Sequence, residues 1–346
     1  MKWFKRAAAL FAAAALFLGM VPKTQAVSAS SAIVMDALTG RVLYEHNADK
    51  RSLIASTTKI MTGYLICRDM DLDETVTVPA EAVGVEGASM YLQPNEELTV
   101  RDLVYGLMLQ SGNDAAVALA ILAGGTVEGF VAQMNEEAQV LGLENTHFEN
   151  PNGLDGETHY STARDLAVLA AKAMECEAFA EIVGTKTVNT AGRSMSNHNK
   201  LLWQLEGAEG VKTGFTKAAG RALVSSVQYE GRRFIIVTLN APDDWNDHKA
   251  LAQEAKEAYT MTELIGAGET AASAEVWNRH ISTLDLVAEE AITFPLLPGE
   301  EVKTRIIAPD YVYGQVDAGE VGGIAEFYVS DKKIGETELR WSGSVS

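Results

Sequence analysis

The chain has 346 residues, more than one compact domain usually contains, so its length predicts two domains. It carries 47 acidic and 28 basic residues, a formal charge of −19. This charge disfavours nucleic acid and anionic lipid surfaces as non-specific partners, because both repel an acidic protein. Any anionic substrate must therefore be held by a few local cations.

The N-terminus has the pattern of a secretory signal. Basic residues precede an apolar run at 7–21, and small residues suited to cleavage follow at Ala26 or Ala29. The run is short for a bilayer span of about 20 residues, although a retained anchor is the alternative. We expect a signal peptide over residues 1–26 and an extracytoplasmic protein, in the cell envelope or secreted. Removing that segment leaves a formal charge of −23.

The mature chain opens with a predicted β-hairpin, in which residues 33–36 and 41–44 flank a turn that ends at Gly40. A block of helices follows, because apolar residues recur every three or four positions. The expected helices cover residues 56–70, 99–110, 113–123, 127–141 and 162–174.

Polar residues mark the boundaries of these helices. Ser56 lies at the start of the first helix, and Thr99 opens the second with an imperfect capping box. Asn113 caps the third helix together with Asp114. The sequence Asn-Pro-Asn-Gly at 150–153 is a turn.

The only cysteines are Cys67 and Cys176, each expected within a helix. In an exported protein they could pair. We expect instead that both are small buried apolar residues.

Beyond residue 174 the period of the pattern changes to two. Runs at 221–228 and 232–240 predict a second hairpin, and Lys212 lies on the strand that enters its sheet. Helices inserted between two hairpins favour an α+β fold, with one antiparallel sheet flanked by a helical lobe. A helix to about Leu264 and a linker at 266–273 precede short alternating strands. We therefore expect domains at residues 30–265 and 274–346, the second a small all-β domain.

Three short motifs stand in one order along the chain: Ser-Thr-Thr-Lys at 56–59, Ser-Gly-Asn at 111–113 and Lys-Thr-Gly at 212–214. Average composition gives about one Ser-x-x-Lys match per chain of this length, and a second does occur at 330–333. The other two motifs are each expected in roughly one chain in fifteen. The ordered set is therefore informative although each member is weak.

These motifs contain the parts of a serine nucleophile. A serine hydroxyl needs a base and a site for the developing oxyanion. Residues three apart share a helix face, so the Lys59 amine can reach the Ser56 oxygen. Lys212, as a second cation nearby, would lower the pKa of Lys59. The Ser56 N–H, with one from the strand after Gly214, would hold the oxyanion.

The remaining motif residues suit substrate binding. The Ser111 hydroxyl can relay a proton, and the Asn113 amide can bind a peptide carbonyl. Lys212, Thr213 and Thr216 offer one charge and two hydroxyls to a terminal carboxylate. If the motifs lie apart, each has an ordinary role as a capping serine, a helix-stop turn or an exposed edge lysine.

Other catalytic systems find little support. The sequence contains no Gly-x-Ser-x-Gly, no His-Glu-x-x-His and no Cys-His cluster, so we expect neither a nucleophile elbow nor a metal site, and no cofactor. The six histidines are expected on the surface or as satisfied core residues. The polar run at 243–248 directly follows a core strand, which suits a loop near the cleft, but we expect a solvated loop and assign it no function.

The motif set resembles that of class A β-lactamases and penicillin-binding proteins. With the segments at 90–94, 150–154, 197–201 and 209–216, the chain from about residue 32 is similar to the low-molecular-weight penicillin-binding D-alanyl-D-alanine carboxypeptidases. The resemblance implies a penicillin-binding transpeptidase/β-lactamase-like domain followed by a β-rich domain. It implies removal of the terminal D-alanine from peptidoglycan stem pentapeptides, with β-lactam antibiotics as covalent inhibitors.

The resemblance also implies residue roles. Ser56 would be the nucleophile, Lys59 the base, Ser111 a proton shuttle, Asn113 a peptide ligand, Lys212 and Thr213 the carboxylate site, and Phe215 an oxyanion N–H donor. The family often ends in a membrane-anchoring amphipathic helix, whereas the last residues here alternate with period two, so anchoring is doubtful.

Two alternatives remain from the sequence. One is a β-lactamase, for which Glu149 is a candidate carboxylate although the Glu-x-x-Leu-Asn pattern is missing. The other is a penicillin sensor or peptidoglycan-binding module without turnover.

Overall fold

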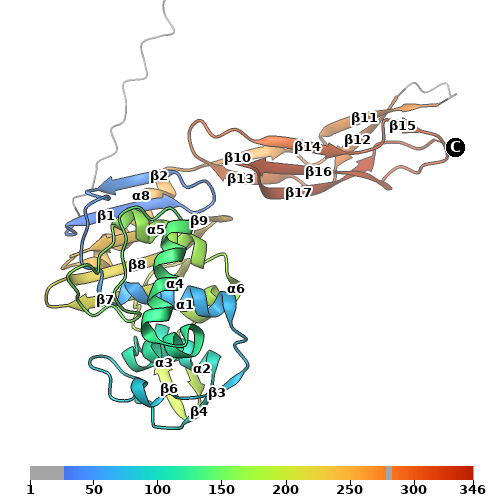
Figure 1. Cartoon of the computed structure of the whole chain (residues 1–346). Helices are drawn as coiled ribbons and strands as arrows, with labels where there is room; N and C mark the ends of the chain where they lie inside the picture. The colour runs from blue at the N-terminus through green and yellow to red at the C-terminus, as the bar shows by residue number, and fades with distance from the viewer. Residues whose placement is uncertain (1–26, 278–282, 346) are drawn as a thin grey trace, which may run out of the picture.

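The structure, a computed structural model, describes residues 27–277 and 283–345. The predicted signal peptide at 1–26 lies outside these residues. Figure 1 shows a larger domain, built of a sheet and helices, from which an elongated β-rich domain extends. The expected α+β class is confirmed.

A five-stranded antiparallel sheet, in the order β2-β1-β9-β8-β7, forms the centre of the larger domain. Both predicted hairpins are confirmed, and Gly40 takes the positive φ (73°) that its turn requires. The strands are β1 Ser31–Asp36, β2 Val42–His46, β7 Ala208–Thr216, β8 Gly220–Tyr229 and β9 Arg232–Leu239.

A helical lobe lies between β2 and β7 in the sequence and covers one face of the sheet, as Figure 1 shows. Side chains of β1 alternate between two cores, because successive residues of a strand point to opposite faces. Ile33 and Met35 face the lobe, whereas Ala32 and Val34 face helix α8 (Asp244–Glu257). The lobe contains α1 Lys59–Asp69, α2 Val100–Leu109, α3 Asn113–Gly124, α4 Val127–Val140, α5 Ala163–Ala173 and α6 Glu177–Gly184.

Several helix boundaries match the predicted signals and others differ. Thr99 and Asp102 form a complete capping box at α2. Cys176, expected inside a helix, instead precedes α6 after a short break. Both cysteines are free and partly buried against the main core. Within the described residues, no single helix is long and apolar enough to cross a membrane; α3 and α4 reach that length only as a pair bent by 84°.

Shorter elements complete the larger domain. They are the 3₁₀ turns η1 Ala55–Thr58 and η2 Ala80–Ala82, helix α7 Leu201–Gln204, and the strand pairs β3 Thr75–Thr77 with β4 Glu97–Thr99 and β5 Thr187–Thr190 with β6 Arg193–Ser196.

The β-rich part begins earlier than the sequence predicts. The helix expected to reach Leu264 ends at Glu257, and residues 260–265 form strand β10, because they pair with β13 about 30 residues further on. The expected linker at 266–273 is also wrong, since β11 already begins at Thr270. The strands are β10 Thr260–Ile265, β11 Thr270–Val276, β12 Thr283–Ala288, β13 Ile292–Leu296, β14 Lys303–Ile307, β15 Tyr311–Val312, β16 Val321–Val329 and β17 Lys332–Trp341.

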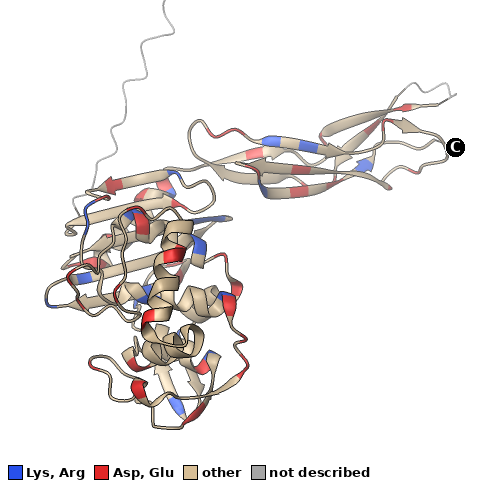
Figure 2. Cartoon of the chain, in the orientation of Figure 1, with Lys and Arg blue, Asp and Glu red and all other residues tan. Residues whose placement is uncertain are grey.

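A buried arginine joins the two parts. Arg232 of β9 is fully buried, where it pairs with Asp36 (3.1 Å) and Glu300 and donates to the Pro295 carbonyl (3.0 Å). The Tyr259 hydroxyl donates to the same Asp36 carboxylate. Figure 2 shows that acidic and basic positions are otherwise spread over both parts.

Candidate active site

The first motif forms a strained turn at the start of α1. Ala55 has a positive φ of 46°, which is unusual for a residue with a side chain, and Ser56 follows it in η1. The Thr57 hydroxyl donates to the Ile54 carbonyl (2.6 Å), and the Thr58 hydroxyl donates to the Ala55 carbonyl (2.9 Å). The two threonines of the motif therefore close the turn that presents Ser56.

Lys59 meets the condition expected of a base. Its amine lies 3.0 Å from the Ser56 hydroxyl oxygen and donates to the Asn113 side-chain carbonyl (2.7 Å) and to the Asn152 carbonyl. The side chain is fully buried. Burial, and then the charge of Lys212, hold the pKa of Lys59 well below its usual value, while Asp114 acts in the opposite direction. A neutral amine therefore becomes available beside the serine.

The second motif connects α2 to α3. Ser111 has a positive φ of 60° and lies in the loop between the two helices. The Asn113 amide group spans from the Lys59 amine to the Glu86 carbonyl (2.6 Å). The expected caps are wrong: Gly112 occupies the N-cap position, and Asp114 instead accepts the N–H groups of Met90 and Leu92.

The third motif lies on β7, with side chains on alternate faces. Lys212 is only 1% exposed, and its amine donates to the Thr213 carbonyl (3.0 Å). Burial lowers the pKa of Lys212 to about 7. Gly214 lies against the nucleophile turn, since a Cβ there would stand 3.1 Å from the Ser56 nitrogen. Glycine therefore allows this approach of strand to turn, whereas a larger residue would push the turn away by a few tenths of an ångström.

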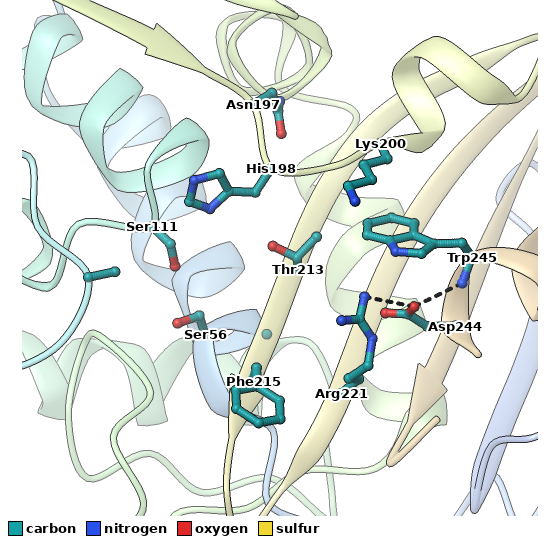
Figure 3. Close-up of a pocket in the computed structure, with 12 residues that line it drawn as sticks. Ser56, Ser111, Asn197, His198, Lys200, Thr213, Phe215, Arg221, Asp244 and Trp245 are labelled. Atoms are coloured by element: carbon teal, nitrogen blue, oxygen red, sulfur yellow. Dashed lines mark hydrogen bonds and ion pairs between the residues drawn. The ribbon is translucent and has the colours of Figure 1, made fainter. Parts of the chain in front are cut away.

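These residues surround one open cavity of about 510 Å³. Ser56, Ser111, Thr213 and Phe215 line it, whereas Lys59 and Lys212 lie buried beneath its wall. In Figure 3 the Ser56 and Ser111 hydroxyls lie on one side of β7, and a second group of polar side chains lies on the other. The lining residues are Ser56, Ala88, Ser111, Asn197, His198, Lys200, Thr213, Gly214, Phe215, Arg221, Asp244 and Trp245.

Thr216, like Asn113 and Lys212, is not among the residues that line the cavity. The Thr216 hydroxyl donates to Asp155 (3.0 Å) and accepts the Ala219 N–H (2.9 Å). Ala219 belongs to the β7–β8 turn, whereas Asp155 belongs to the distant segment that follows the turn at 150–153. These two groups are the hydrogen-bond partners of the Thr216 hydroxyl, and the substrate contact expected of Thr216 stays a prediction.

The sequence interpretation missed the far wall of the cavity. Arg221 pairs with Asp244 (2.9 Å), and its guanidinium lies 5.5 Å from the Trp245 ring centre. The run at 243–248, expected to be a solvated loop, begins α8, because its acidic residues suit a helix N-terminus. His248 in that run is fully buried. Arg221 is directly opposite Phe215 in the β7–β8 register. Its place at the cavity could therefore be predicted only from that register.

Among the residues described, no cluster of His, Cys, Asp or Glu is arranged to hold a metal ion. Comparison with known proteins identifies the fold and chemistry more directly. Residues 19–243 match the peptidase S11 family model, described as D-alanyl-D-alanine carboxypeptidase, and residues 259–345 match the C-terminal domain of penicillin-binding protein 5.

Individual relatives agree with these matches. The chain is 33% identical to D-alanyl-D-alanine carboxypeptidase DacF of Bacillus subtilis, over 84% of this chain and 79% of that protein. It is also 33% identical to the Escherichia coli carboxypeptidase DacC, over 95% and 87%. The crystal structure of penicillin-binding protein 5 from Haemophilus influenzae superposes with a TM-score of 0.67 and 30% identity, covering 95% of this chain and all of that one. The chain therefore belongs to the peptidase S11 family and is a serine-type D-alanyl-D-alanine carboxypeptidase.

Proposed function

We propose that Ser56 is the nucleophile and Lys59 its general base. One observation carries this proposal: a buried lysine amine lies 3.0 Å from a serine hydroxyl at the wall of the cavity. The neutral amine takes the hydroxyl proton while the Ser56 oxygen attacks the carbonyl carbon of the penultimate D-alanine. The N–H groups of Ser56 and Phe215 would stabilise the resulting oxyanion.

Collapse of the tetrahedral intermediate breaks the peptide bond and leaves an acyl-Ser56 ester. The departing D-alanine nitrogen needs a proton, which the Lys59 ammonium supplies through the Ser111 hydroxyl in this proposal. Water then attacks the ester with its proton passing to Lys59, and hydrolysis returns the free serine. Lys59 gives the water proton to the Ser56 oxygen as the ester breaks, so each proton that Lys59 takes up is released again within the same half-reaction.

The substrate would be bound along β7. Asn113 would hold a peptide carbonyl, and Thr213 would hold the terminal carboxylate with the positive potential of Lys212 behind it. Arg221 adds a partly exposed cation to this group, since paired residues of β7 and β8 share a face and Arg221 lines the same cavity as Thr213.

Family membership supports peptidoglycan stem peptides ending in D-alanyl-D-alanine as the substrate and β-lactams as acylating inhibitors. It also supports location in the cell envelope after export. We place the boundary between the two domains near residue 259, where α8 gives way to β10. A β-lactamase activity is not proposed, because Glu149 does not line the cavity and its carboxylate accepts the Thr158 N–H (2.7 Å).

The test uses the mature chain with a pentapeptide ending in D-alanyl-D-alanine and with labelled penicillin. We expect released D-alanine and one penicillin adduct on Ser56, both lost in Ser56→Ala. Release of D-alanine by Ser56→Ala would refute the assignment. Stoichiometric acylation without peptide turnover would indicate a sensor, and penicillin hydrolysis at tens per second would indicate a β-lactamase.

A further inference from the structure

Ala55, the residue before Ser56, is kept at a positive φ by hydrogen bonds from a distant part of the chain. A residue with a side chain at positive φ costs free energy, of order 1–3 kcal/mol, and persists only when its surroundings fix it. The Ala55 carbonyl is the group whose direction this conformation sets. It accepts the Thr58 hydroxyl (2.9 Å), so the orientation of Thr58 matters to the turn.

Thr58 is itself oriented by a histidine from a distant segment. The His159 Nε2 lies 2.7 Å from the Thr58 hydroxyl oxygen, and the His159 Nδ1 accepts the Glu149 backbone N–H at 3.0 Å. A backbone N–H can only donate, so Nδ1 carries no proton, and in the neutral ring Nε2 must carry it. A directed chain results: Glu149 N–H to His159, His159 N–H to Thr58, and Thr58 O–H to the Ala55 carbonyl.

His159 has no route to the substrate. Its side chain is 1% exposed, its ring packs edge-on against Phe148 at 5.9 Å, and it does not line the cavity. Burial lowers the pKa of His159 to about 4, with Glu149 opposing this effect. The ring is therefore neutral under ordinary conditions, as the chain of hydrogen bonds requires.

The same segment touches the nucleophile region at three further points. The Pro151 carbonyl accepts the Thr62 hydroxyl (2.7 Å), and the Asn152 carbonyl accepts the Lys59 amine. Gly153 lies so close to the turn that a Cβ would stand 2.0 Å from the Ala55 carbonyl oxygen. The segment from 149 to 159 thus braces both the nucleophile turn and its base.

We propose that His159, as the neutral Nε2–H tautomer, is a positioning residue for acylation. Through Thr58 it fixes the Ala55 carbonyl and so the hydroxyl and N–H of Ser56. This inference rests on the proposed role of Ser56 as nucleophile. The residue acts through Thr58 and touches no reacting atom.

His248 provides a matched control. It is equally buried and also bonded to two hydroxyls, those of Ser225 (2.6 Å) and Thr238 (2.9 Å). Both partners lie in the sheet, and within the part of the chain that the structure describes no hydrogen-bond chain leads from His248 to Ser56. Replacing either histidine removes a satisfied core ring. Only the replacement of His159 should change the acylation step.

The experiment measures acylation of the mature chain by a fluorescent penicillin in stopped flow. It yields the dissociation constant of the first complex and the acylation rate constant. We expect His159→Leu to lower the rate constant by 10–100-fold. The dissociation constant should change by no more than 2-fold in either direction. His159→Gln, which offers an acceptor and a donor on one planar group, should restore most of the rate. His248→Leu should leave it within 2-fold of wild type.

A double-mutant cycle separates positioning from general loss of structure. Thr58→Val should reduce the rate constant by about as much as His159→Leu, and the double variant should be no more than 3-fold slower than the slower single variant. The inference would be overturned if the two single losses multiply in the double variant. It would also be overturned if His159→Leu acylates at the wild-type rate, or if His159→Gln acylates no faster than His159→Leu. If His159→Leu does not fold, the Gln variant and Thr58→Val still decide. Acylation that persists in Ser56→Ala would instead refute the proposed nucleophile.

Discussion

The buried histidine of α8 should make the catalytic domain sensitive to acid. His248 has no exposed surface, and burial lowers its pKa to about 3. Its two hydroxyl partners, on Ser225 and Thr238, can satisfy the neutral ring completely, because each can donate or accept. The perturbation is a pH change from 7 to 5, applied to wild type and to His248→Gln.

The sign and size of the effect follow from proton linkage. An unfolded histidine has a pKa of about 6.5, so below that pH the unfolded chain binds a proton that the folded chain excludes, and stability is lost as the pH falls. At pH 5 the folded ring is still neutral, so the loss depends only on the unfolded value. It amounts to about 2 kcal/mol between pH 7 and 5, at about 1.4 kcal/mol for each pH unit below 6.5.

His159 adds a similar loss of stability over the same range, because its folded pKa is about 4.

The assay is hydrogen exchange of the β8 and β9 amides at several pH values, since it reports opening of this sheet separately from the β-rich domain. Between pH 6 and 5, His248→Gln should reduce the slope of stability against pH by nearly one proton. An unchanged slope would show that the folded protein already carries a proton on His248 at these pH values.

Three further substitutions test other parts of the structure. Gly153→Ala should destabilise the protein by about 2–4 kcal/mol and slow acylation more than 10-fold, because residue 153 has a φ of 89° and an alanine Cβ there would meet the Ala55 carbonyl. The control Gly142→Ala, also at positive φ but with open space around it, should leave acylation unchanged. Arg232→Leu should lower the free energy of unfolding by about 3–5 kcal/mol in chemical denaturation, because it leaves two acidic partners unpaired at the domain junction. Lys303→Met, which removes an exposed ion pair, should have no measurable effect. Equal effects would show that the buried pair stabilises the protein no more than an exposed one does. Arg221→Ala should raise KM at least 10-fold for a peptide with a free terminal carboxylate and leave unchanged the KM of the matching C-terminal amide, and a parallel change in both would remove Arg221 from carboxylate binding.

The sequence predicts best those features that depend on neighbours along the chain. The helix that carries Lys59, the Thr99 capping box and both hairpins of the main sheet follow from local spacing and turn chemistry. Ser56, expected as the first residue of that helix, lies in the 3₁₀ turn η1 that leads into it. The contact between Ser56 and Lys59 is also local, because three residues make one turn. Apart from the start of that helix, these predictions are confirmed at the expected positions.

What the sequence does not reveal depends on distant partners. From the sequence alone, residues 260–264 are predicted to continue a helix, and their pairing with β13 is what makes them strand β10. Arg221 enters the cavity because of the β7–β8 register, and His198 because the segment before α7 reaches the same cavity. His159 is invisible as a positioning residue until its segment is seen against Thr58. In each case the missing information is a non-local contact.

The two buried lysines show what this active site costs the fold. Among the described residues, neither Lys59 nor Lys212 forms a salt bridge, and burial lowers the pKa of Lys212 to about 7. From pH 7 to about 10.5 the unfolded chain holds a proton that the folded chain lacks, so stability rises with pH over this range.

At pH 7 the protein therefore forgoes stability that an apolar residue of similar length would retain, several kcal/mol at about 1.4 kcal/mol per pKa unit. We expect Lys212→Met to be inactive yet more stable than wild type at pH 7, with an advantage in urea denaturation that shrinks as the pH rises towards 10. If Lys212→Met is less stable than wild type at pH 7, the lysine is paired or hydrated in the folded protein. In that case the charge of Lys212 would be offset by its partner or by water, burial alone would have to lower the pKa of Lys59, and the proposed base would have to be reconsidered.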